Sequence, residues 1–342
     1  MRHFSEDPNF HLSFMTKILK FIAIVLVSVL IICGYSFLTD KTYYKEWSIT
    51  KLKSDTSKIS WVKFVWTNDS ISGKYYTRTS MQIPCKIGDL PYNFSFQFDL
   101  GAYTGIYENT AISFNEKYPE KKIRIVRLRS PLQFWFNKKA SRDLTLLFGN
   151  YVANNKWSNF YENYGPKINT ENYSSNDTFD IGTIGADLFK GKVLMIDYPN
   201  QQFAICDTIP SNYNCNFSSI ELDAAGRVLL PMKINSKNYK TMFDNGSSLF
   251  PLIVTHDKIN SFSTLQNTDT LKINGWGKPI TMIGRPINNS IILAGITFNN
   301  IKVYADYRHE MRTDKFDAIT GNVLFWDKTI MIDFKNRKFG VK

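Results

Sequence analysis

Apolar and polar residues alternate over many short stretches of the chain. The segment FSFQF at 94–98 places an apolar residue at every second position, and SWVKFVW at 60–66 alternates aromatic and polar residues less strictly. Such alternation is typical of a β-strand with one buried face. Gly, Asn and Asp separate these stretches, and few segments outside 21–38 show a helical period. The sequence therefore predicts a mostly β protein, with a strand at 60–66, a turn at 68–70 and another strand after it.

Two later segments give weaker signals. Residues 121–129 alternate charged and apolar side chains, which favours a half-exposed strand. Residues 154–177 are polar and aromatic without a clear period, so we expect a long surface loop there.

Cys206 and Cys215 flank a short polar stretch. A disulfide between them and two free thiols are both compatible with this spacing.

One segment breaks the β pattern. Residues 21–38 form an uncharged run of 18 residues, long enough for a transmembrane helix or an uncleaved signal anchor. A cleaved signal peptide is the alternative. The polar segment 1–20 carries Lys17 and Lys20, and positive charge on this side favours a cytoplasmic N-terminus. We therefore expect a single-pass membrane protein whose C-terminal domain is extracytoplasmic, either periplasmic or extracellular.

Composition narrows the functional classes. The chain has 342 residues, 43% apolar and 15% aromatic, which suits about two globular domains. Its net charge of +12 comes from scattered Lys and Arg residues, so we expect a solvated basic surface and no nucleic-acid partner. The four His form no ligand-like pair, and no P-loop or dinucleotide fingerprint is present. We expect neither a metal nor an organic cofactor.

The chain contains an internal repeat. An Asp-x-Gly sequence follows a predicted strand twice, at Asp99 and at Asp244. Farther on, residues 185–205 align without gaps with residues 321–341, and nine of these 21 positions are identical. Two copies are too few for a solenoid. We therefore expect two β lobes, at 39–215 and at 216–342, each carrying one Asp-Gly turn.

Two such turns can form one chemical site. If the copies pack around a pseudo-twofold axis, Asp99 and Asp244 meet in the cleft between the lobes. Two carboxylates in contact cannot both ionise, so they share a proton. The ionised member then acts as a general base on water, and the protonated member donates to a scissile carbonyl. Activity is expected on the acidic side of neutral.

These residues resemble a known family. The sequence DNGSS at 244–248 is similar to the second catalytic loop of pepsin-like, two-lobed aspartic peptidases, and DLGA at 99–102 to the first. Residues 179–185 and 318–322 resemble the segments that pass beneath those loops. Ala102 resembles the more distant retroviral type. The resemblance implies a bilobal acid-protease fold and a monomer, with a peptide or protein as substrate.

The resemblance also assigns roles. It implies that Asp99 and Asp244 are catalytic, and that Gly101, Ala102, Gly246 and Ser247 shape their loops. The paired aspartates that end the closing strands, Asp197 and Asp333, are expected to have only a structural role in the turns that follow.

The loops depart from the family where Thr or Ser normally follows each Asp. Leu100 cannot make the cross-loop hydrogen bond of that residue, and Asn245 can make only its half. The tyrosine-bearing flap is also missing, with residues 148–151 the nearest candidate. An active membrane-anchored endopeptidase is the first hypothesis. The alternatives are an inactive domain that binds extended peptides in its cleft, and an anchored β-domain with a structural role, which predicts that the two aspartates lie apart.

Overall fold

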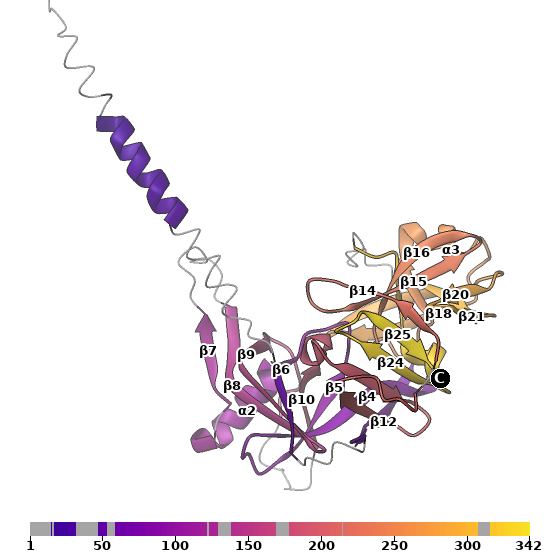
Figure 1. The fold of residues 1–342 in the computed structure, drawn as a ribbon, viewed down its shortest axis with the longest axis horizontal. Helices are drawn as coiled ribbons and strands as arrows, with labels where there is room; N and C mark the ends of the chain where they lie inside the picture. Colours follow the sequence, from indigo (N-terminus) through magenta and orange to yellow (C-terminus); the bar gives the residue numbers. More distant parts are fainter. Residues whose placement is uncertain are drawn as a thin grey trace, which may run out of the picture.

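The computed structural model describes residues 15, 17–31, 47–52, 59–121, 123–128, 138–168, 178–213, 215–306 and 315–342. Over these residues, strands dominate and form three sheets (Figure 1). The prediction of a mostly β protein is confirmed.

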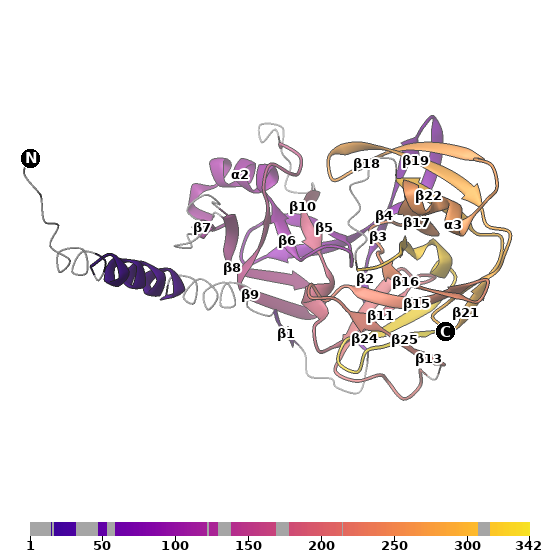
Figure 2. The same ribbon diagram turned by 90° about the horizontal axis from the view of Figure 1, so that it is seen from above.

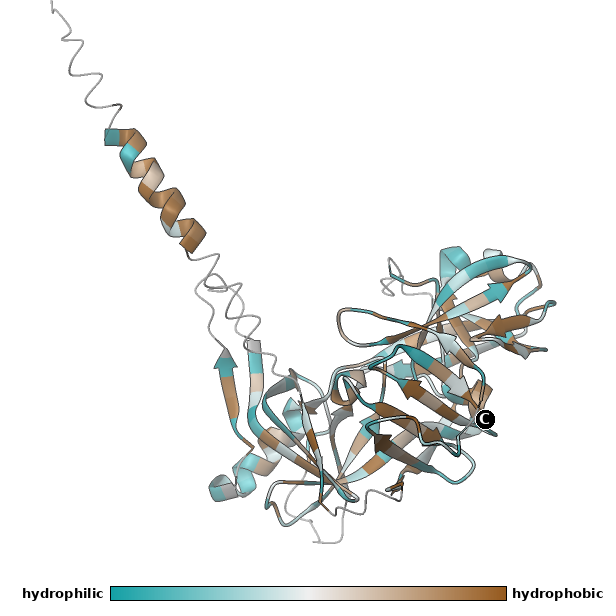
Figure 3. Ribbon diagram, viewed as in Figure 1, coloured by the Kyte–Doolittle hydropathy of each residue, from teal (hydrophilic) through white to brown (hydrophobic). Residues whose placement is uncertain are grey.

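The N-terminal helix covers residues 17–31 and is mostly hydrophobic (Figure 3). Its large apolar side chains are exposed. Among the described residues, no helix is long and apolar enough to cross a membrane. The predicted span at 21–38 continues through residues 32–38, which lie outside the described residues, as do residues 1–14 of the predicted cytoplasmic segment.

The first sheet is built from the first copy of the repeat. Its strand order is β1-β9-β6-β10-β5-β4-β8-β7, with β3 paired to β4. Helix α2 (Glu108–Lys117) follows β6 directly. The strands are β1 (Ser48–Lys51), β3 (Val65–Ile71), β4 (Lys74–Ile87), β5 (Asn93–Phe98), β6 (Gly105–Tyr107), β7 (Ile125–Leu128), β8 (Lys138–Phe148), β9 (Tyr151–Tyr161) and β10 (Thr178–Ile184).

A second large sheet is built from the second copy. Its order is β18-β19-β22-β17-β23-β16-β15-β20-β21, with β14 paired to β15. Helix α3 (Ile259–Phe262) is a single turn after β17. The strands are β14 (Glu221–Leu222), β15 (Val228–Ile234), β16 (Lys237–Phe243), β17 (Leu252–Thr255), β18 (Asp269–Gly275), β19 (Lys278–Pro286), β20 (Ile291–Leu293), β21 (Ile296–Phe298), β22 (Lys302–Asp306) and β23 (Ala318–Thr320).

The third sheet joins the two copies. Its order is β13-β25-β24-β11-β12-β2. β11 pairs antiparallel with β24, which is the same strand of the repeat, and the aligned residues Met195 and Met331 lie opposite each other. The two copies therefore meet through equivalent strands. The strands are β2 (Val62–Lys63), β11 (Val193–Asp197), β12 (Gln202–Cys206), β13 (Phe217–Ser219), β24 (Thr329–Asp333) and β25 (Lys338–Val341).

Equivalent aromatic residues hold the strand that precedes each Asp. Phe98 ends β5, is fully buried, and packs on Phe203 at 5.3 Å between ring centroids. Phe243 ends β16 and packs in the same way on Phe339 at 5.9 Å. Burying a Phe side chain stabilises a fold by roughly 1.5–3 kcal/mol. The core therefore fixes both strand ends, and with them the start of each Asp loop.

The segment predicted as a surface loop at 154–177 is partly wrong. Residues 154–161 form the second half of β9, which pairs with β1, β8 and β6. Buried polar residues obscured the strand pattern, because Asn155 and Ser158 face inward. Ser158 shares a hydrogen bond with the buried Ser141 of β8, which satisfies its hydroxyl. Residues 169–177 lie outside the described residues.

The turn predicted at 68–70 is also misplaced. Those residues belong to β3, and the chain reverses at Ser72 and Gly73, where φ is 52° and 79°. Positive φ at both central residues suits a tight hairpin. The strand predicted at 121–129 is present in part as β7.

The described cysteines and the repeated aspartates have simple outcomes. Cys85, Cys206 and Cys215 are free thiols, so the structure contains no disulfide between the last two. Asp197 accepts hydrogen bonds from the backbone N–H and the side-chain amide of Asn200, and Asp333 does the same for Asn336. These two carboxylates fasten the turns that follow their strands, as the sequence predicts.

Candidate active site

The two Asp-x-Gly sequences begin equivalent loops, which we call the first Asp loop (residues 99–104) and the second Asp loop (residues 244–249). The Asp99 N–H donates to the Ile184 carbonyl at 2.9 Å, and the Asp244 N–H donates to the Thr320 carbonyl at 2.9 Å. These acceptors end β10 and β23, which run parallel to β5 and β16 respectively. The same strand pairing therefore positions both aspartates.

Glycines let the two loops touch. A Cβ on Gly101 would lie 2.6 Å from Cγ of Asp244, and a Cβ on Gly246 would lie 2.5 Å from Cγ of Asp99. Each carboxyl group thus occupies the space that a side chain on the opposite glycine would need. The two predicted catalytic residues lie together, although 145 positions separate them in the sequence.

Further glycines let another segment pass beneath each loop. A Cβ on Gly185 would lie 2.1 Å from the Ala102 carbonyl oxygen, and one on Gly321 would lie 2.0 Å from that of Ser247. Because these contacts are with backbone atoms, no side chain fits there. Residues 179–185 and 318–322 therefore occupy equivalent places under the two loops.

The two carboxyl groups share a hydrogen bond in a buried site. Burial, the charge of Asp244 and this hydrogen bond raise the pKa of Asp99 well above its ordinary value. Asp99 is 5% exposed. The Gly246 N–H and the Ser247 hydroxyl donate to the two oxygens of Asp244 at 2.9 and 3.0 Å. The Gly101 N–H donates to Asp99 in the same way, so only the Ser247 hydroxyl distinguishes the two carboxyl groups. A hydroxyl donor stabilises an ionised carboxylate, and the pKa of Asp99 is the one that is raised, so the site favours a proton on Asp99.

Asn245 links the loops on one side only. Its Oδ1 accepts a hydrogen bond of 2.6 Å from the Leu100 N–H. Leu100 is fully buried and offers no polar atom in return. Below them, the Asn322 amide donates to the Asn245 carbonyl at 3.2 Å and to the sulfur of Met81 at 3.2 Å. The predicted half of the cross-loop bonding is therefore present.

A cleft of about 1000 Å³ opens above the two aspartates. Asp99, Gly101, Asp244, Gly246 and Ser247 line it; Ala102 does not.

Two hairpins border this cleft. They are β3–β4 and β18–β19, which lie side by side in Figure 2, and the Lys272 N–H donates to the Ser72 hydroxyl between them at 2.9 Å.

The flap candidate at 148–151 is wrong. These residues form the β8–β9 turn, and none of them lines the cleft. The β18–β19 hairpin borders the cleft instead and carries Trp276 at its tip. The Trp276 ring stacks on Tyr161 at 5.0 Å and also contacts Tyr164 at 5.2 Å. Sequence reasoning missed these residues. The Asn-Gly pair at 274–275 is a hairpin signal in the sequence, but it lies in β18; the turn is at Trp276 and Gly277, where φ is 51° and 75°.

Comparison with known proteins leaves the site to be interpreted on its own geometry. No family model matches the chain, and no curated protein matches it. Among the described residues, no three His, Cys, Asp or Glu side chains are placed to hold a metal ion.

Proposed function

We propose that this protein is an aspartic-type endopeptidase with a bilobal, pepsin-like fold, in which Asp99 and Asp244 act together on one water. The observation that carries the proposal is the contact of the two Asp loops, where each glycine makes room for the opposite carboxyl group. Two hydrogen-bonded carboxyls beneath a cleft of about 1000 Å³ are suited to general acid–base hydrolysis of a bound peptide. A purely structural role gives no reason for this contact.

The proposed reaction uses the two aspartates in different roles. Asp244 takes a proton from water as the water oxygen attacks the carbonyl carbon, and Asp99 gives its proton to the carbonyl oxygen. The resulting tetrahedral intermediate then loses its C–N bond. The proton on Asp244 passes to the leaving amine, and Asp99 recovers a proton from the intermediate as the new carboxylic acid forms. Both aspartates thus end the cycle in the protonation states in which they began it.

Cleavage of peptides by the purified full chain tests this proposal. A mixed peptide library is incubated from acid to neutral pH with the wild type, with Asp244→Asn and with the exposed-site control Asp143→Asn. The expected result is acid-favoured cleavage that falls by about 10²–10⁴-fold in Asp244→Asn and persists in the control. Equal cleavage by wild type and Asp244→Asn would contradict the proposal.

A second candidate is a non-catalytic domain that binds extended peptides in the same cleft. Leu100 favours it, because this buried apolar side chain replaces a hydroxyl that would bond across the loops. Peptide binding without cleavage at any pH would identify this function.

The membrane anchor belongs to the same proposal. The uncharged run at 21–38 supports it, together with the exposure of the apolar side chains in its described part. Fractionation of cells producing the full chain, compared with residues 39–342, tests it. Recovery of the full chain in the soluble fraction, rather than with the membranes, would contradict it.

A further inference from the structure

A second pocket opens beside the cleft. It has a volume of about 360 Å³ and lies between the end of β9, strand β10 and the β18–β19 hairpin. Tyr164 and Asn274 line both this pocket and the cleft. The second pocket and the cleft therefore adjoin at Tyr164 and Asn274.

The pocket contains a carboxyl group with no partner. Asp180 lies in it, and its Oδ1 is buried without a hydrogen-bond partner among the described residues. No ion pair of Asp180 with a described residue is present either. Burial raises the pKa of Asp180 to about 7. Unpaired buried acceptors are uncommon because the lost solvation costs about 1–3 kcal/mol. A ligand with a hydrogen-bond donor would satisfy the Asp180 Oδ1.

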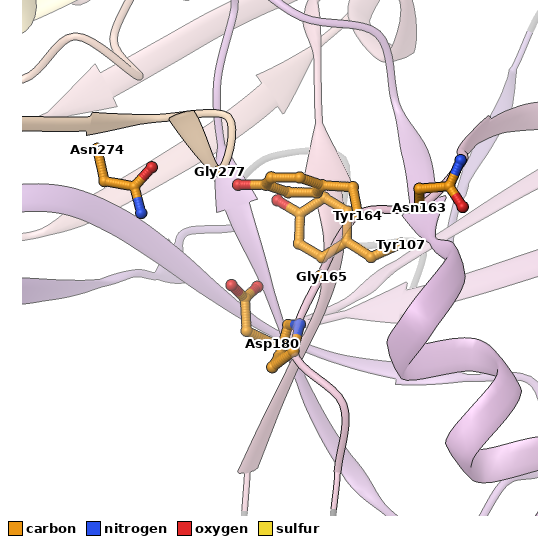
Figure 4. A pocket seen from close by; sticks show the side chains of 8 residues that line it. Tyr107, Asn163, Tyr164, Gly165, Asp180, Asn274 and Gly277 are labelled. Carbon is orange, nitrogen blue, oxygen red and sulfur yellow. The ribbon is translucent and has the colours of Figure 1, made fainter. Parts of the chain in front are cut away.

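The walls around Asp180 suit a cation. Its carboxyl group points toward the rings of Tyr107 and Tyr164, with Asn163 and Asn274 on either side (Figure 4). The two tyrosine rings meet edge to face at 4.8 Å. Aromatic faces attract ammonium and guanidinium groups, and a carboxylate supplies the opposite charge.

The Tyr107 hydroxyl already has another hydrogen-bond partner. The Tyr107 hydroxyl is hydrogen-bonded to the Thr183 hydroxyl at 2.7 Å. An apolar group in the pocket would leave the Asp180 oxygen unpaired, and an anion would be repelled by it. None of the lining residues is a Lys or Arg.

We propose that the second pocket binds the Lys or Arg side chain of a peptide held in the cleft, with Asp180 as its counter-ion. This inference rests on the proposed function, because the cleft must first bind a peptide. Asp180 is then a specificity-determining residue, and Tyr107 and Tyr164 provide the apolar walls for the methylene groups of the bound side chain.

The preference for a cation should grow between pH 5 and pH 7. The titratable groups that face Asp180 are Tyr107 and Tyr164, and burial raises the pKa of both above 10, so both stay neutral over this range. Only the Asp180 carboxyl changes charge there. Its ionised form pairs with the bound cation.

The test compares paired peptides that differ only by Lys or norleucine at one position, scanned along the sequence. The ratio of kcat/KM for the two peptides is measured at pH 5 and pH 7. At one position we expect lysine to be favoured at least tenfold at pH 7. In Asp180→Asn that ratio should fall to near one, while the exposed-site control Asp143→Asn keeps it. No lysine preference at any position, or a preference that persists in Asp180→Asn, would overturn the proposal.

A second variant guards against a folding defect in Asp180→Asn. Asn274 is exposed on the hairpin. Asn274→Lys supplies a tethered cation to the pocket and should also reduce the lysine preference, whereas Asn274→Gln should keep it. Retained preference in Asn274→Lys would count against the proposal.

Failure of the proposed function is distinguishable from failure of this inference. If no peptide is cleaved or bound, the pocket is tested alone with butylguanidinium, followed through the NMR signals of Trp276. Saturable binding by the wild type that is lost in Asp180→Asn would retain the cation site. No binding by the wild type would overturn it.

Discussion

The two Asp loops have the same backbone and different side-chain anchors. In each loop the glycine N–H donates to the aspartate Oδ1 at 2.9 Å, and the N–H of the next residue donates to the aspartate carbonyl at 3.1 Å. The side chains that fasten them are not equivalent. The conserved geometry therefore comes from backbone hydrogen bonds and from the glycines, which leave the side chains free to differ between the copies.

The first loop is anchored through Thr104. Its N–H and hydroxyl both donate to Asp187, at 2.7 and 2.8 Å, and Trp47 donates to the same carboxylate. In the second copy the aligned residues are Leu249 and Val323, which cannot form these bonds.

The second loop is anchored nearer to its start, where the Asn322 side-chain amide donates to the Asn245 backbone carbonyl. Their counterparts in the first copy are Leu100 and Ala186. Each copy thus uses a polar pair where the other has an apolar pair. The first copy therefore anchors its loop through two side chains, Thr104 and Asp187, whereas the second uses the Asn322 side chain on a backbone carbonyl.

The largest expected effect comes from closing the space between the loops. Gly246→Ala puts a methyl group 2.5 Å from Cγ of Asp99, so the carboxyls must separate. We expect peptide cleavage to fall by more than about 10²-fold, because misplaced catalytic groups lose this much. Asn238→Ala, at an exposed strand position, is the control. An active Gly246→Ala protein would show that the close contact is not needed.

The second effect concerns pH and stability. Folding raises the pKa of Asp99, so the folded protein keeps a proton that the unfolded chain has released. The contribution of Asp99 to stability is therefore greatest below pH 4 and falls as pH rises toward the folded pKa, by at most about 1.4 kcal/mol per pH unit. Asp99→Asn should gain stability relative to wild type as pH rises. Urea unfolding from pH 4 to 8 measures this, and parallel curves would contradict it.

A smaller effect should follow when the second loop is made like the first. Asn245→Leu removes the acceptor of the Leu100 N–H, which is buried. We expect a loss of about 1–3 kcal/mol in the free energy of unfolding. Asn238→Leu, at an exposed strand position, is the matched control. Equal stability of the two variants would mean that the cross-loop hydrogen bond contributes nothing.

The smallest effect concerns the residue after each glycine. Ser247→Ala gives the second loop the same residue as Ala102 in the first, and removes the hydroxyl that donates to Asp244. Loss of a hydrogen bond to a charged group costs about 1.5 kcal/mol, so kcat/KM should fall roughly tenfold. Peptide kinetics with Ser247→Thr as the conservative control measures it. An unchanged rate would show that Asp244 does not depend on this donor.

The repeat explains why the site could be predicted from the sequence. Each Asp-x-Gly follows a predicted strand, and a glycine-containing segment, 179–185 or 318–322, comes later in the same copy. This pattern indicates Asp99 and Asp244 before their separation in space is known. Local pattern and duplication agree at these positions.

Other parts of the structure carry no such signal. Helix α2 is one example, because its short apolar pattern is weak. The contact of Trp276 with Tyr164 joins distant segments that the repeat does not relate. Asp180 lies in the segment 179–185, whose glycines carry the sequence signal. That its oxygen is buried without a partner follows only from the packing around it. Residues that act through long-range packing leave little trace in one sequence.

The most direct test of the account is the titration of the two carboxyl groups in the full chain. Aspartate labelled with ¹³C at the carboxyl carbon reports each protonation by NMR. We expect Asp99 to titrate well above the ordinary range, and we expect Asp244→Asn to lower the pKa of Asp99. If Asp99 titrates near pH 4 and does not respond to Asp244→Asn, the two carboxyls share no proton and the central claim is wrong.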